Sequence, residues 1–145
     1  MDIKIGEREI PMLMTVAEMA EIQEEIGCTV GQLRDEVFGI EINFEAEKEE
    51  DQIHFGIVED GKKIRKFAKL IRILGNAGLE EAGKEPDLTD KWILRHMKPG
   101  MLMAYVVGVT AIINAAMQIE TAEEKQDAPV DEVLEEENRK KEPET

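Results

Sequence analysis

The sequence predicts a mainly α-helical fold with a small N-terminal β-hairpin, an α+β architecture in which a compact helical domain precedes a flexible acidic tail. Apolar residues recur at spacings of three and four through much of the chain, which is typical of amphipathic helices. Alternation of apolar and polar residues is clearest in the first 14 residues. After residue 119 the composition becomes strongly acidic, so we expect a domain over residues 1–119 and a tail over 120–145.

Composition narrows the class of protein. The chain has 145 residues, of which 42% are hydrophobic and 35% charged, a balance that suits one globular core with a strongly hydrated surface. A formal net charge of -15 repels phosphate backbones and anionic lipid headgroups, so no nucleic acid partner is expected. Cys28 is the only cysteine and residues 1–10 lack the pattern of a signal peptide, which favours a reducing cytoplasm.

The first 26 residues predict a hairpin followed by a helix. Ile3 and Ile5 alternate with polar residues, glycine permits a tight turn at residues 6–7, and residues 10–14 form a second apolar run. Thr15 can cap the next helix while Glu18 reaches back to it, the pattern of a capping box. The apolar face of that helix is predicted to contain Val16, Met19, Ile22 and Ile26.

A second short helix is predicted after a left-handed stop at Gly27, because Thr29 and Gln32 repeat the capping-box pattern. Its apolar residues are Val30, Leu33 and Val37. Residues 45–51 are almost wholly charged and are predicted to form an exposed loop. Residues 53–58 fit a short strand ending at a turn at residues 60–61, and they fit irregular structure equally well.

Two further helices are predicted in the middle of the chain. Apolar residues at helical spacing over residues 64–74 predict a helix that ends near residues 75–78, with a basic opposite side. Thr89 is predicted to cap a short helix through residues 92–97. Pro99 interrupts that helix and suits the first turn of the next one.

Residues 99–119 carry no charge, which is long enough to raise the question of a membrane span. A weakly polar stripe argues against that interpretation, and Tyr105 alone does not make an aromatic belt. The stripe consists of Met103, Val107, Thr110, Asn114 and Gln118. We therefore expect a buried or partner-binding helix and no membrane partner.

Residue patterns typical of catalytic or metal sites are absent from the sequence. Burial at a helix start is the simpler explanation of Cys28, and His54 and His96 do not stand at metal-ligand spacing. Gly75, Gly78 and Gly83 precede no Gly-Lys-Ser/Thr, and residues 75–78 follow a predicted helix instead of a strand, so we interpret these glycines as helix terminators. We expect a protein that is not an enzyme and needs neither cofactor nor metal.

A basic stripe stands out against the acidic background. Lys62, Arg65, Lys69 and Arg72 share one predicted helical face. One interpretation is a solvated stripe that faces the chain's own acidic residues 45–51. The other is a self-assembly surface that meets the acidic surface of a neighbouring copy in a homo-oligomer.

The chain resembles the tail assembly chaperones of long-tailed phages and prophages. The resemblance rests on residues 3–27, where a strand pair enters a capped helix, and on residues 70–117. The second segment contains Leu-Gly-Asn-Ala-Gly-Leu at residues 74–79, Pro-Asp-Leu-Thr at residues 86–89, and a Pro-led helix.

The resemblance implies a non-enzymatic protein of the bacterial host cytoplasm that binds and solubilises the tape measure protein and helps recruit tail tube subunits. Methionine-rich apolar surface suits a helical partner. The predicted partner-binding residues are Met101, Leu102, Tyr105, Val109 and Ile112. The alternative is a minor structural or head-tail joining protein of a phage tail.

Overall fold

The computed structural model describes residues 1–49 and 52–118. Its elements are β1 (Asp2–Ile5), β2 (Arg8–Pro11), α1 (Val16–Glu25), the 3-10 helix η1 (Val30–Gln32), the π-helix η2 (Arg34–Phe38), β3 (Ile40–Ile42), β4 (Ile53–Phe55), the 3-10 helix η4 (Gly56–Glu59), α2 (Gly61–Glu81), α3 (Asp90–His96), the 3-10 helix η5 (Pro99–Met101) and α4 (Leu102–Ala116). Mainly helical structure with an N-terminal hairpin confirms the predicted fold. The predicted tail, residues 120–145, lies outside the described residues.

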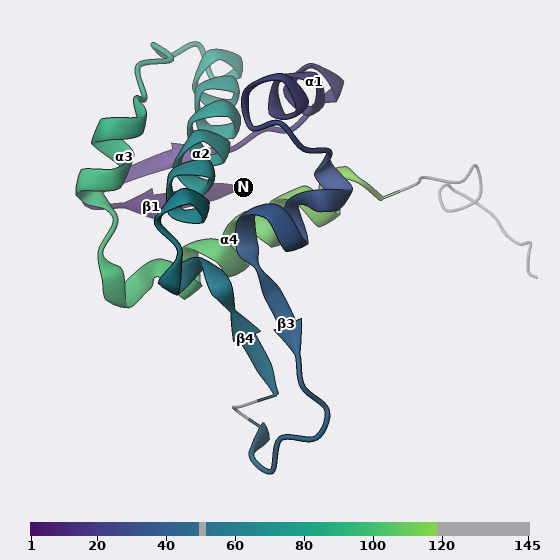
Figure 1. Ribbon diagram of the computed structural model, residues 1–145. Helices are drawn as coiled ribbons and strands as arrows, with labels where there is room; N and C mark the ends of the chain where they lie inside the picture. Colours follow the sequence, from purple (N-terminus) through teal and green to yellow (C-terminus); the bar gives the residue numbers. More distant parts are fainter. Residues whose placement is uncertain (50–51, 119–145) are drawn as a thin grey trace, which may run out of the picture.

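Helix α2 is the centre of the molecule, with α1 and α3 beside it and α4 crossing below (Figure 1). Its buried residues include Phe67, Leu70, Ile71 and Leu74, which have almost no exposed surface. Asp60 caps the helix, because its Oδ1 accepts hydrogen bonds from the backbone N–H groups of Lys62 and Lys63 at 2.9 and 3.3 Å. The predicted turn at residues 60–61 is therefore the start of α2.

The predicted end of this helix near residues 75–78 is wrong, because α2 continues to Glu81. A Cβ atom on Gly78 would lie 2.0 Å from the Pro11 carbonyl oxygen, and one on Gly75 would lie 2.5 Å from Leu88 Cδ1. These glycines are needed for close packing and do not terminate the helix. The terminator is Gly83, whose φ of 76° is left-handed and allows the Lys84 N–H to bond the Leu79 carbonyl at 2.8 Å.

The β1–β2 hairpin packs on α2 and α4. Its antiparallel register pairs Ile3 with Ile10, and both side chains are buried. Arg8 anchors the outer end of β2, since its guanidinium lies 2.7 Å from Asp87 Oδ1 and 5.6 Å from the centre of the Trp92 ring. Trp92 also stacks on His96, with ring centres 4.3 Å apart.

Helix α1 has the predicted capping box, in which the Thr15 N–H donates to Glu18 Oε1 at 2.7 Å. Ile22 and Ile26 are buried as predicted, but Val16 is 78% exposed. Val16 lies about 120° around the helix from Ile22, so it misses the apolar face. The Thr29 capping box also forms, although the segment it opens is η1 followed by the π-helix η2.

A second hairpin was only half predicted. Residues 53–55 form β4 as one of the two interpretations proposed, and residues 56–59 form a 3-10 helix instead of continuing the strand. Strand β3, over residues 40–42, was not predicted; it pairs antiparallel with β4. Residues 45–49 are exposed or partly exposed, and residues 45–48 lie outside helices and strands, whereas residues 50–51 are outside the described part.

Candidate partner-binding surfaces

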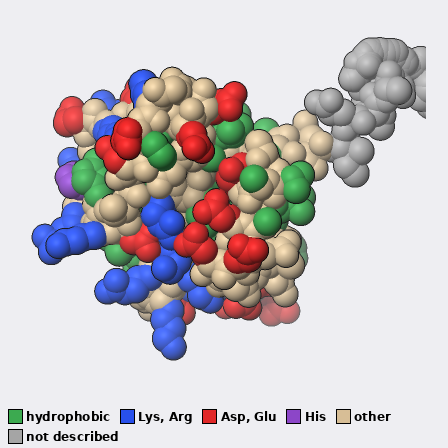
Figure 2. All heavy atoms as spheres, turned by 90° about the horizontal axis from the view of Figure 1, so that it is seen from above, with side chains coloured by type: hydrophobic (Ala, Val, Ile, Leu, Met, Phe, Trp, Pro, Cys, Tyr) green, Lys and Arg blue, Asp and Glu red, His purple; other side chains and the backbone are tan. Residues whose placement is uncertain are grey.

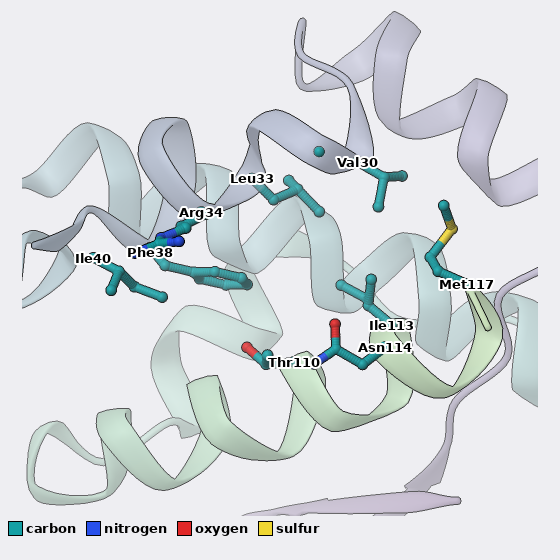
Figure 3. Close-up of a pocket in the computed structure, with 10 residues that line it drawn as sticks. Val30, Leu33, Arg34, Phe38, Ile40, Thr110, Ile113, Asn114 and Met117 are labelled. Carbon is teal, nitrogen blue, oxygen red and sulfur yellow. The ribbon is translucent and has the colours of Figure 1, made fainter. Parts of the chain in front are cut away.

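An apolar groove with a volume of about 500 Å³ separates the η1–η2 segment from the C-terminal half of α4. Figure 3 shows Val30, Leu33 and Phe38 across from residues of α4, with Ile40 at one end of the groove and Met117 at the other. The α4 side of the groove is formed by Thr110, Ile113, Asn114 and Met117.

The wall formed by η2 is fixed from behind by α2. Phe38 packs edge-to-face on Phe67, with ring centres 5.9 Å apart. The Lys63 ammonium group donates to the backbone carbonyl of Asp35 at 3.0 Å, close to the start of the π-helix. Gly39 then turns the chain into β3 with a φ of 61°. Contacts with α2 therefore hold the η2 side of the groove in place.

The chemistry of the groove suits apolar side chains. Leu33, Phe38 and Ile113 are buried at its base, while Thr110 and Asn114 provide polar groups along one edge. Among the described residues that line it, Arg34 is the only charged one. Such a surface can accept the apolar face of a helix, in which side chains recur every three or four residues.

Helix α4 extends this surface outward. Its side away from the core is exposed at Ala104, Val107, Ala111 and Ala115, which we call the outer face of α4. Val107 is its largest side chain and is 61% exposed. Asn114 lies about one helical turn from Ala111 and about two turns from Val107 on the same side of α4, so the outer face continues into the groove edge.

The segment Pro99–Ala116 is long and apolar enough to cross a membrane by length and composition, and 28% of it is buried in the molecule. Core helices of soluble proteins can have the same length and apolar composition.

The five predicted partner-binding residues lie mostly on the opposite side of α4. Tyr105, Val109 and Ile112 are buried in the chain's own core. Leu102 is partly buried and Met101 is 47% exposed. Only the last two are accessible in this structure, because the most apolar face of α4 packs inward against the rest of the domain.

The predicted basic stripe is divided by the fold. Arg72 Nε lies 2.6 Å from Asp90 Oδ1 and Arg72 Nη2 lies 2.5 Å from Glu25 Oε1, while Lys69 Nζ lies 3.3 Å from Asp90 Oδ2. Lys62 and Arg65 are exposed and form no ion pair with a described residue. The stripe therefore meets acidic groups of α1 and α3, and within the described residues no ion pair joins it to the 45–51 loop.

These ion pairs shift the pKa values of their members. The hydrogen bond from Arg72 lowers the pKa of Glu25 below its ordinary value of 4.5. Burial opposes ionisation of Asp90, but hydrogen bonds and charge from Arg72 and Lys69 outweigh it and lower the pKa. Hydrogen bonds to Glu25 and Asp90 in turn raise the pKa of Arg72. Arg72 thus joins α1, α2 and α3 through a charged cluster.

The remaining candidate chemistry is structural in character. Burial raises the pKa of the Cys28 thiol, which disfavours the reactive thiolate. His54 faces Glu59 at 3.5 Å, and the Nδ1 atom of His96 lies 2.8 Å from the Trp92 carbonyl oxygen. Within residues 1–49 and 52–118, no group of three or more His, Cys, Asp or Glu side chains could hold a metal ion.

Sequence reasoning missed the groove. A signal was present in the sequence, because Thr110 and Asn114 belong to the weakly polar stripe that argues against a membrane span. That stripe does lie away from the core, with Val107 and Asn114 exposed. The opposite wall had no comparable signal, since the approach of Leu33 and Phe38 to α4 depends on contacts between distant segments.

Comparisons with known proteins give no further assignment. No family model matches the chain. No curated protein and no solved structure matches it significantly. Function must therefore be argued from the groove, the outer face of α4 and the resemblance described above.

Proposed function

We propose that this chain is a phage or prophage tail assembly chaperone, a non-enzymatic protein that binds the tape measure protein and keeps it soluble. The observation that carries the proposal is the apolar groove, which continues into the exposed outer face of α4. A surface of this shape and chemistry fits an amphipathic helix. The order of motifs along residues 3–27 and 70–117 supplies the named role.

The strong negative charge supports such a role. A formal net charge of -15 keeps a complex with an apolar partner soluble, because copies repel one another. Recruitment of tail tube subunits is assigned by the resemblance to the C-terminal part, of which residues 119–145 lie outside the described structure. That part of the proposal rests on the resemblance alone.

Co-expression with the tape measure protein of the same gene cluster tests the proposal. Size-exclusion chromatography with light scattering should detect a stoichiometric complex that keeps the tape measure protein in solution without detergent. Failure to bind and to solubilise it would overturn the proposal. A requirement for detergent would favour membrane association of Pro99–Ala116 instead.

A matched pair of variants locates the contact. Val107→Asp places a charge on the outer face of α4 and should abolish the complex, whereas Val16→Asp changes a similarly exposed residue on α1 and should leave it intact. Equal binding by both variants would exclude the outer face as the binding surface. Mass spectrometry of mature particles separates the alternative, because a minor structural or head-tail joining protein would remain in the virion.

A further inference from the structure

The second hairpin forms an arm that projects away from the body of the molecule (Figure 1). We define the arm as residues 40–49 and 52–55. Its register pairs Ile40 with Phe55 and Ile42 with Ile53, which places these four side chains on one face of the hairpin. Glu41 and His54 pair on the other face.

Only the inner half of this apolar face is covered. Ile40 and Phe55 pack against the core of the same chain. Further out, Ile42 is 44% exposed, Ile53 is 53% exposed and Phe44 is 83% exposed. An isolated two-stranded hairpin is only marginally stable, and clustered exposed apolar side chains mark an interaction site. Within residues 1–49 and 52–118, the outer half of the arm therefore lacks a surface to pack on.

A basic surface with an apolar hollow, complementary to the exposed apolar residues of the arm, lies on α2, α3 and η5. Arg65, Lys91 and Arg95 line one hollow with Leu94 and Asp90. An adjacent apolar hollow of about 260 Å³ is bordered by Lys98 and lined by Val58, Ile64, Leu94, Met97, Pro99 and Leu102. We call Lys62, Arg65, Lys91, Arg95 and Lys98 the cationic face; none of the five forms an ion pair within residues 1–49 and 52–118. Figure 2 shows Lys and Arg side chains gathered on one side of the molecule.

The arm carries the opposite charge. Its described residues include Glu41, Glu45, Glu47 and Glu49 against a single Lys48. The acidic, partly apolar arm is therefore complementary to a basic surface that contains an apolar hollow, and the chain carries both. Opposite charge steers such contacts and fixes their register.

We propose that the arm of one copy docks on the cationic face of a second copy, with Phe44 and Ile42 entering the apolar hollow and the arm glutamates meeting Arg65, Arg95 and Lys98. The contact cannot form within one chain, because β4 leads through η4 to Val58 at the border of that same hollow while the paired strands direct the arm tip away from it. The groove beside α4 fits the arm less well, since Arg34 is the only charged residue among the described residues that line it.

The proposal goes beyond chaperone function and concerns the chain without its partner. It also replaces the predicted self-assembly surface, since Lys69 and Arg72 are already paired inside the molecule and only Lys62 and Arg65 of that set remain on the cationic face. A head-to-tail contact of this kind joins different surfaces of the two copies.

Photo-cross-linking tests the contact directly. The full chain with a benzophenone amino acid in place of Phe44 is mixed in light-isotope and heavy-isotope forms, irradiated, and digested for mass spectrometry. The expected product joins residue 44 of one isotope form to residues 91–102 of the other. Cross-links confined to one isotope form, cross-links to the acidic tail, or a monomeric wild-type chain at 100 micromolar protein would each overturn the proposal.

Variants provide a second readout by sedimentation equilibrium. Phe44→Asp should weaken self-association more than about tenfold, as expected for an aromatic anchor, while Val16→Asp should not change it. The double variants Lys91→Glu/Arg95→Glu and Glu45→Lys/Glu47→Lys should each weaken self-association, and their mixture should recover it through the matched charges. The arm contact would be contradicted if the mixture did not self-associate. It would also be contradicted if the self-association of the mixture disappeared once nucleic acid was removed.

Discussion

The two β-hairpins of this chain have the same antiparallel pairing and opposite surroundings. In β1–β2, Ile3, Ile5 and Ile10 are buried against helices. In β3–β4, the equivalent apolar face is covered at its inner pair and exposed at its outer pair. Backbone pairing is therefore not what distinguishes a core element from an interaction element. The difference is whether a helix lies beneath the apolar face.

Among the variants that compare the two hairpins, Gly78→Ala should cause the largest loss of stability. The added Cβ would lie 2.0 Å from the Pro11 carbonyl oxygen, so β2 must move off α2. We expect destabilisation of about 3 kcal/mol or more, because the clash is with backbone and cannot be relieved by rotating a side chain. Urea unfolding measures it, with Gly100→Ala as the control since a Cβ there meets nothing within 4 Å. Equal stability of the two variants would refute the close approach of β2 to α2.

A matched pair of isoleucine truncations compares the hairpins directly. Ile10→Ala should cost roughly 2–4 kcal/mol because the side chain is fully buried, while Ile53→Ala in the dilute, monomeric chain should cost less than about 1 kcal/mol. Both values come from denaturant midpoints at equal m-values. A large cost at Ile53 would mean that the arm packs on the body of its own chain.

Asn76→Ala tests the layer that covers the first hairpin. The Asn76 carboxamide accepts from the Leu88 N–H at 2.9 Å and donates to the Leu88 carbonyl at 3.2 Å, which holds Leu88 over Gly75 beside Ile10. Removal leaves two partly buried backbone groups without this partner, so we expect a loss of about 1–3 kcal/mol. Hydrogen exchange should accelerate at Leu88 and in β2 and remain unchanged in β3–β4. Uniform acceleration would argue against a local role.

The smallest expected effect is a dependence on acid pH. Folding lowers the pKa values of Glu25 and Asp90 below their ordinary values of 4.5 and 3.8. Their contribution is therefore fully present above those ordinary values and is lost as pH falls through the depressed ones. Arg72→Met should flatten the loss of stability below pH 4.5, measured by thermal unfolding at several pH values. The effect should be modest, because exposed ion pairs are screened by solvent.

Local signals in the sequence predicted local structure well. The capping boxes at Thr15 and Thr29, the cap at Thr89 and the left-handed stop at Gly27 all formed, because each depends on residues within a few positions. The predicted end of α2 was wrong because Gly75 and Gly78 are required by close packing against Leu88 and Pro11, which are distant from them in the sequence. Strand β3 and the groove were missed for the same reason, since partners distant in the chain define both.

Trp92 is the chain's only tryptophan, and its position decides what ultraviolet fluorescence can report. The indole contacts Arg8 of β2 and stacks on His96 of α3, so its emission reports on how the first hairpin packs against α3. The arm contains phenylalanine and histidine but no indole. An intrinsic-fluorescence unfolding curve will therefore register the opening of the covered hairpin directly, and loosening of the arm alone will leave that signal unchanged.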